Sequence, residues 1–362
     1  MAYTTIDDPT LYFSTTLYTG NAADDRAVTI DGTGMQPDMV WNKSRSLGEG
    51  HVLGDSVRGV QRKIVPNDTD AQSSSSSFTN FSTITSTGFT VSKGGVDGAV
   101  NQNGATYCNW AWKAGTAVSG NSTGSGTAKA YSGSVNTDVG FSIIKYIGNG
   151  TSAHTIPHHL GAVPQWVLIK ETSNGSDWMG YHIGIGNTKT IKLNEPEAPV
   201  TRTDWWNDTT PTSSVVTLGD NGEINQNDTN YIMYSFSQKQ GYSKFSSYIG
   251  NGNANGTFVY TGFKPAFIIQ KEAGNTRDWT MIDNTRSPFN AADDRLVPNT
   301  SNAEVTNNIT DLLSNGFKMR NTQSNTNGNG SSYIYMAFAE NPFVTSTGVP
   351  ATARWLCSYL LT

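Results

Sequence analysis

Short apolar runs, each preceded by a proline and followed by glycine, asparagine or serine, dominate the chain. Three of them read DMVWNK, QWVLIKE and AFIIQKE. Each has the length of a strand and is rich in branched and aromatic side chains. The proline stands where its missing amide hydrogen leaves a ladder intact. Helical periodicity is limited to a single possible turn in NITDLLSNG, so the pattern predicts an all-β protein.

These runs belong to a larger unit that occurs three times. YTGN, YIGNG and YIGNGN precede them in the same order, and a lysine closes each run. The prolines and the lysines both keep offsets of 127 and 101 residues between copies. They are Pro37, Pro164 and Pro265, and Lys43, Lys170 and Lys271. A unit of roughly a hundred residues is one domain in size. We therefore expect three tandem β-sandwich or jelly-roll domains built on an internal repeat.

The repeat divides the chain into six segments. We predict an N-terminal attachment segment at residues 1–10, sandwich units at 11–114, 139–240 and 241–343, a linker or surface arm at 115–138, and a C-terminal assembly tail at 344–362. Residues 115–138 are almost entirely small and polar, which favours an exposed, flexible connection.

Aromatic residues mark the expected core and the expected contact with partners. Trp41, Trp166 and Phe267 align across the three copies, and each is expected to face the core of its own domain. Five large side chains crowd into the last eight residues, where they would be a liability on a free monomer. They are Trp355, Leu356, Tyr359, Leu360 and Leu361. We expect this tail to bind a partner, with Met1 to Pro9 as a second contact. The alternative is that the tail adds a last strand to the third domain.

Composition excludes several classes of protein. Only 15% of the residues are charged, the net charge is −5, and no run of lysine or arginine could neutralise a row of phosphates, which disfavours nucleic-acid binding. No stretch approaches the ~20 apolar residues of a membrane span. MAYTTIDDPT has no basic region followed by an apolar run, so no secretory signal is expected. Cys108 and Cys357 are far apart and are expected to be small buried hydrophobic groups.

The residues with possible chemistry have simpler structural explanations. The lysine after each strand is expected to solvate a strand end, although its recurrence invites a catalytic interpretation. His158 and His159 are adjacent and would point to opposite faces of a strand, so HTIPHH fits loop histidines better than a metal site. DSVRG and DNTRS place an aspartate and an arginine three residues apart, as a salt bridge across a turn requires. We expect no enzyme activity, metal or cofactor.

One segment suggests a binding surface. In DWWND, Trp205 and Trp206 are flanked by Asp204 and Asn207. If the segment is extended, two adjacent tryptophans cannot both enter one core. Aromatic faces rimmed by amides and carboxylates are suited to gripping sugar rings. We predict a glycan or partner contact here, with protein–protein packing as the other interpretation.

The motifs YTGN, PDMVWNKSR, DSVRG, GFTV and YCNWAWKA resemble those of a repeated β-domain of virion and tail proteins of marine tailed phages, including cyanophages. Such domains are similar to the concanavalin-like lectin sandwich. The resemblance implies a structural protein on the virion exterior, assembled in the host cytoplasm as a tail fibre or appendage, or else a capsid decoration protein. It implies virion proteins, other copies of the chain and host-surface glycans as partners. Alternatives from other classes are a carbohydrate-binding module and a polysaccharide depolymerase.

Overall fold

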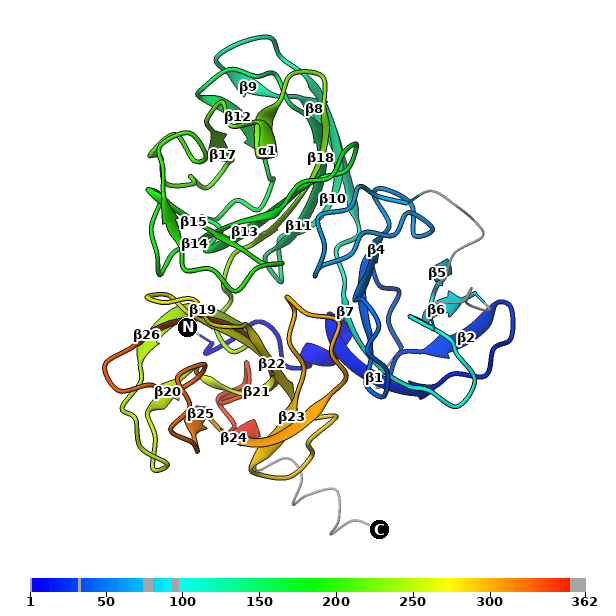
Figure 1. Ribbon diagram of the computed structural model, residues 1–362, viewed down its shortest axis with the longest axis vertical. Coiled ribbons are helices and arrows are strands. Elements are labelled where there is room, and N and C mark those ends of the chain that lie inside the picture. Colours follow the sequence, from blue (N-terminus) through cyan, green and yellow to red (C-terminus); the bar gives the residue numbers. More distant parts are fainter. Residues whose placement is uncertain (1, 32–33, 74–80, 93–97, 352–362) are drawn as a thin grey trace.

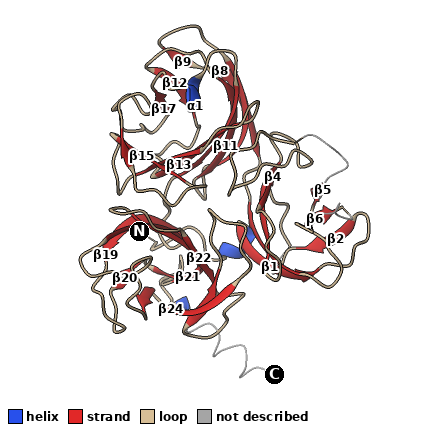
Figure 2. Cartoon of the chain, viewed as in Figure 1, coloured by secondary structure: helices blue, strands red, loops and turns tan. Residues whose placement is uncertain are grey.

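The computed structural model describes residues 2–31, 34–73, 81–92 and 98–351. The fold is all-β, as predicted, and the helical segments of the described part are the 3-10 turn η1 (Pro9–Leu11) and the four-residue helix α1 (Gly222–Asn225). Figure 1 shows three lobes around a common centre, and Figure 2 shows that strands build each of them. We define the first lobe as residues 13–112, the second as 116–236 and the third as 243–342.

Each lobe has an inner sheet that faces the centre. In the first lobe its order is β1 (Phe13–Thr19), β7 (Thr106–Trp112), β3 (Met39–Ser44) and β4 (Val52–Asp55). In the second lobe it has eight strands, ordered β16 (Val200–Thr201), β15 (Lys189–Lys192), β14 (Trp178–His182), β13 (Trp166–Glu171), β18 (Asn230–Phe236), β11 (Phe141–Ile147), β10 (Ala130–Asn136) and β8 (Thr116–Asn121). In the third it is β19 (Ser243–Ile249), β26 (Ser332–Pro342), β21 (Phe263–Glu272) and β22 (Thr280–Asp283).

A second, outer sheet covers the other face of each inner sheet. The first lobe has β2 (Arg26–Thr29), β6 (Gly88–Val91) and β5 (Phe81–Thr85). The second has β17 (Val215–Leu218), β12 (His154–Pro157) and β9 (Thr123–Gly124). The third has β20 (Phe258–Tyr260), β25 (Gly316–Met319), β24 (Val305–Leu313) and β23 (Ala292–Arg295). All pairings between these strands are antiparallel, and two sheets facing each other in each lobe are consistent with a β-sandwich.

The inner sheets bury both faces, which corrects one prediction. Successive residues of a strand point to opposite faces. Val40, on β3, belongs to a hydrophobic cluster within the first lobe, whereas its neighbour Trp41 belongs to a cluster shared by all three lobes. Trp166 and Phe267 lie in the same shared cluster. The prediction that each of these aromatic rings faces the core of its own domain is therefore wrong, because they build one common core.

Residues 115–138 form strands, so the predicted linker or arm is also wrong. β10 pairs with β11 along six residues, β8 pairs with β10, and β9 pairs with β12. Backbone hydrogen bonds to existing strand edges hold this segment, and such bonds need no apolar side chains. The small residues have steric roles, because a Cβ at Gly133 would overlap the carbonyl oxygen of Ile143. The segment thus widens the second lobe.

The two ends of the described chain meet at the third lobe. Tyr3 donates its hydroxyl to the carbonyl oxygen of Gly262 at 2.7 Å, and Thr4 donates to that of Gln240 at 2.8 Å. Ile6 is buried in the common core. Residues 2–10 therefore fasten the first lobe to the third within the chain, a role that the prediction of an attachment segment did not include.

Candidate functional site

A tyrosine and an asparagine close one end of each lobe and explain the YxGN motif. The hydroxyls of Tyr18, Tyr146 and Tyr248 donate to main-chain carbonyls at 2.6 to 2.7 Å. The residue after each carbonyl is a fully buried asparagine whose Oδ1 accepts the backbone N–H of the motif's own asparagine at 3.0 Å. These buried residues are Asn101, Asn225 and Asn327. Sequence reasoning missed them, although each begins an NxN pattern, NQN, NQN or NGN.

A ring N–H from each lobe bonds to a carbonyl of another lobe. Trp178 of the second lobe donates to the carbonyl of Val65 at 2.9 Å, and Trp279 of the third donates to that of Lys192 at 3.0 Å. His51 of the first lobe is 3.1 Å from the carbonyl of Val297. Its Nδ1 accepts from Trp41, so its Nε2 carries the proton and donates. Burial lowers the His51 pKa to about 3, which keeps the ring neutral. The three bonds run around the centre in one sense.

A second set of contacts uses the DSVRG and DNTRS motifs. Asp55 and Arg58 pair at 2.7 Å, and Asp283 and Arg286 pair at 2.6 Å, with all four side chains buried. The predicted bridge therefore forms in both motifs, but inside the protein. Each aspartate also faces another lobe. Asp55 accepts from the Tyr234 hydroxyl at 2.6 Å, and Asp283 accepts from the indole of Trp110 at 3.1 Å.

The second lobe makes this contact with a histidine. His182 closes β14, as Asp55 closes β4 and Asp283 closes β22. Its Nε2 is 3.1 Å from the carbonyl of Tyr335 in the third lobe, and its Nδ1 accepts from the N–H of Gly184. Met336 on β26 takes the place that Trp110 has on β7 and Tyr234 has on β18. Because methionine offers no N–H or O–H to a carboxylate, a neutral donor at position 182 fits the contact. Burial lowers the His182 pKa to about 4.

The three strand-closing lysines are buried, so the prediction that they solvate strand ends is wrong. Lys43, Lys170 and Lys271 are fully buried, and each ammonium group donates to two main-chain carbonyls. For Lys170 one of these carbonyls is that of Thr69 in the first lobe, at 2.9 Å. Burial lowers the pKa of each lysine to about 8. These lysines bind the chain's own carbonyls.

The predicted glycan contact is wrong as well. Trp205 and Trp206 are both buried in the core of the second lobe. Their indoles donate to Glu223 at 3.3 Å and to the carbonyl of Lys189 at 3.1 Å. Both rings enter one core because the segment is a turn, in which Asn207 has a φ of 49°. Asp204 binds Arg202 at 2.6 Å and the side chain of Asn221, so it serves the turn.

The remaining predicted residues have separate places. His154 contacts Asn225 and Ser122, His158 contacts the carbonyl of Thr212, and His159 contacts Tyr131. Cys108 is buried, as predicted. The tail residues and the second cysteine lie outside the described residues, namely Trp355, Leu356, Cys357, Tyr359, Leu360 and Leu361.

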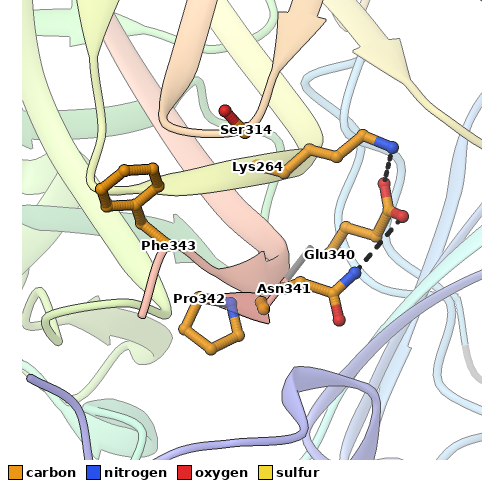
Figure 3. A pocket seen from close by; sticks show the side chains of 7 residues that line it. Lys264, Ser314, Glu340, Asn341, Pro342 and Phe343 are labelled. Atoms are coloured by element: carbon orange, nitrogen blue, oxygen red, sulfur yellow. Dashed lines mark hydrogen bonds and ion pairs between the residues drawn. The ribbon is translucent and has the colours of Figure 1, made fainter. Parts of the chain in front are cut away.

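A pocket of about 310 Å³ lies on the third lobe where the described chain ends (Figure 3). Lys264 and Glu340 pair within it at 2.8 Å, and Phe343 and Ala351 also line it. The N–H of Phe343 and the hydroxyl of Tyr3 both donate to Gly262. Both ends of the described chain therefore meet beside this pocket. Phe343 and Tyr260 are exposed aromatic side chains, and the Tyr260 hydroxyl lies 3.4 Å from that of Tyr3. An amphipathic pocket beside exposed aromatics is suited to binding a polypeptide.

A family model described as a domain of unknown function (DUF7483) matches residues 8–342. The chain is a DUF7483 protein. The match runs from the residue before η1 to the last residue of β26, so one DUF7483 unit comprises all three lobes. Comparisons with curated proteins and with solved structures found no match to this DUF7483 protein. No helix among its described residues is long and apolar enough to cross a membrane.

Proposed function

We propose that the chain consists of three tandem β-sandwich domains built on an internal repeat. Three correspondences support this. The strand order β1-β7-β3-β4 matches β19-β26-β21-β22 and the middle of the eight-stranded sheet. The tyrosine–asparagine contacts recur with the same atoms and nearly the same lengths. The ring-to-carbonyl bonds between lobes recur at Trp178, Trp279 and His51. These residues lie at matching places, since Trp178 begins β14, Trp279 directly precedes β22 and His51 directly precedes β4.

We propose that this protein is a structural component of the exterior of a tailed phage virion, in a tail fibre or similar appendage. The resemblance of the YTGN, DSVRG and YCNWAWKA motifs to virion and tail β-domains supports this function. The observation that carries it is that features suited to attachment are gathered on one lobe. Both ends of the described chain meet on the third lobe beside an amphipathic pocket and exposed aromatic side chains, whereas the first and second lobes extend away (Figure 1). A pocket and exposed aromatic side chains on one lobe are suited to attaching the protein to a neighbouring component.

We also propose a binding and structural role without catalysis. The polar groups that could have served chemistry are engaged in buried contacts within or between the lobes. They include the three lysines, His51, His182 and the two aspartate–arginine pairs. A general base or nucleophile must reach a substrate, whereas these groups bond to main-chain carbonyls or to one another in buried positions.

Immunogold electron microscopy of particles from the virus that encodes this chain tests the virion proposal. An antibody raised against the isolated protein is expected to label the tail. Gold on the faces of the capsid would instead indicate a decoration protein. Purified particles that carry no label, while the infected cells do, would contradict a virion location altogether. Pre-immune serum is the control.

A further inference from the structure

Two of the interfaces between lobes contain a buried aspartate–arginine pair. Among the described residues, a second carboxylate binds the arginine in one of the two. Between the third lobe and the first, Arg286 binds Asp283 through Nε at 2.6 Å and Glu304 through Nη1 at 3.0 Å. Glu304 also accepts from Nη2 of Arg45, in the first lobe, at 2.6 Å. Two guanidinium groups are thus bridged by one carboxylate of the chain itself.

Between the first lobe and the second, a neutral residue takes the place of that carboxylate. Gln72 follows IVPN by the same number of residues as Glu304 follows LVPN. The backbone supports the match, because Gln72 N–H donates to the carbonyl of Thr172 in the second lobe and Glu304 N–H donates to that of Arg45 in the first. Arg58 binds Asp55 through Nε at 2.7 Å and Gln72 through Nη1 at 3.3 Å.

The terminal nitrogens of the two arginines also differ. Nη2 of Arg286 donates to the carbonyl of Met281 at 3.3 Å, whereas Nη2 of Arg58 is buried and makes no such bond. Nη1 of Arg58, which corresponds to the nitrogen that binds Glu304 in Arg286, donates to the carbonyl of Arg62 and to Gln72. Among the described residues, Asp55 is therefore the one carboxylate that pairs with Arg58.

A polar cavity of about 260 Å³ lies at this position, between the first and second lobes. Arg58, Arg62 and Lys145 line it, together with four uncharged polar residues. Within the described residues neither Arg62 nor Lys145 forms an ion pair. Ser173 Oγ accepts two hydrogen bonds from Asn230, which leaves its hydroxyl hydrogen for another acceptor. Asp55 neutralises Arg58, so the cavity has an excess of about two positive charges.

We propose that this cavity binds an external oxyanion, a phosphate, sulfate or carboxylate group, which does between the first and second lobes what Glu304 does between the third and first. Arg62 and Lys145 supply two positive charges to such a group, and the Ser173 hydroxyl can donate a hydrogen bond to it. The cavity is larger than one small anion, so the group can be a free ion or the charged substituent of a saccharide. In either case the bound anion fastens two lobes together.

Thermal unfolding of the full chain in sodium sulfate and in sodium phosphate, against sodium chloride of equal ionic strength, tests the proposal. Because an anion that binds only the folded protein stabilises it by mass action, the melting temperature is expected to rise and then saturate with sulfate or phosphate. The Arg62→Gln/Lys145→Gln variant, altered at a mostly solvent-facing pair, is expected to bind sulfate about tenfold more weakly or worse. Lys239→Gln/Lys318→Gln removes the same charge elsewhere and is expected to keep the wild-type response.

The Gln72→Glu variant gives a second, independent readout. It supplies the missing carboxylate within the chain, so its melting temperature without sulfate is expected to exceed that of the wild type, and added sulfate is expected to have little further effect. A wild-type response that does not saturate, or that is unchanged in both Gln72→Glu and Arg62→Gln/Lys145→Gln, would overturn the proposal.

A comparison of ligands identifies the source of the anion. Isothermal titration with inorganic sulfate and with a sulfated oligosaccharide gives two dissociation constants. Equal constants indicate a free ion. Binding of the oligosaccharide at least about tenfold tighter, lost in Arg62→Gln/Lys145→Gln, indicates a charged saccharide, because a sugar ring adds contacts in the remaining volume. Failure of either arm leaves the virion proposal unaffected, since that proposal rests on the third lobe.

Discussion

Single side chains in this protein carry the contacts between lobes, and their partners were not visible in the sequence. DSVRG and DNTRS predicted a salt bridge across a turn, and Asp55–Arg58 and Asp283–Arg286 form it. Their burial depends on residues 179 and 173 positions away, Tyr234 and Trp110. Trp205 and Trp206 do not form a surface site because the chain turns at Asn207. No local sequence pattern predicted the positive φ of this residue.

The Glu304 carboxylate is expected to contribute far more to the free energy of unfolding than an exposed acidic side chain does. In Glu304→Gln, Arg286 and Arg45 lose their common carboxylate in a largely buried place, so the free energy of unfolding should fall by about 3–5 kcal/mol. Urea unfolding followed by tryptophan fluorescence measures this. Asp311→Asn removes a partly exposed ion pair with Arg320 and should cost under about 1 kcal/mol. Equal effects of the two variants would contradict the interface that we describe.

His51 and His182 are expected to make the fold sensitive to acid. Their pKa values in the folded protein are about 3 and about 4, below the ordinary value of about 6.5. Below pH 6.5 the two histidines therefore take up protons in the unfolded chain but stay neutral in the folded protein. Stability is fully present above that pH and falls by about 1.4 kcal/mol per pH unit for each histidine as the pH drops towards 4.

Urea unfolding at a series of pH values measures this dependence. The matched variant is His51→Gln/His182→Gln, because a glutamine amide can still donate to a carbonyl and does not titrate. A slope between pH 6.5 and 4 that is the same in the variant and in the wild type would assign the acid sensitivity to other groups.

At the scale of strands, the sequence predicted those elements that bury apolar side chains. β3, β13 and β21 coincide with the three apolar runs. The pattern could not assign their faces, because a strand buried on both sides has no alternation to read. It also missed β8, β9 and β10, whose contribution comes from backbone pairing at the edges of β11 and β12. The glycine and serine content of this segment led to the prediction of a flexible connection.

Gly133→Val is expected to loosen β10 from β11. The added side chain would collide with the carbonyl oxygen of Ile143 and with the Ile144 side chain. Amides of β11 should then exchange their hydrogens at least about tenfold faster, as the ladder between the strands opens. Hydrogen exchange read by mass spectrometry reports this. Ser119→Val, at an exposed position of β8, serves as the control. Unchanged protection of β11 would mean that the segment contributes little to the lobe.

For the whole molecule, the common core is expected to make the three lobes unfold as one cooperative unit. Phe13, Trp166 and Phe267 come from three different lobes and lie in the same hydrophobic cluster. This shared core could not be predicted, since internal periodicity indicates that copies exist but not that they share a core. The DUF7483 match across residues 8–342 agrees with a unit of three lobes.

Trp166→Ala is therefore expected to destabilise all three lobes together. Loss of this indole from the common core should cost about 3–5 kcal/mol. Amides of the inner sheets in every lobe should lose protection from hydrogen exchange by the same amount. Val163→Ala, at a partly exposed position nearby, should change stability by under about 0.5 kcal/mol. Loss of protection confined to the second lobe would show that the lobes unfold independently.

The bond between His51 and Val297 has a consequence for synthesis on the ribosome. The first lobe leaves the ribosome with Trp110 and Trp112 on a face that is completed by later parts of the chain, including Phe267 of the third lobe. About 185 residues separate Trp112 from Val297. At 5–20 residues per second the nascent chain carries this apolar face uncovered for roughly ten to forty seconds. During that time neighbouring chains on one messenger can exchange third lobes, and chaperones that bind exposed aromatic segments have their substrate.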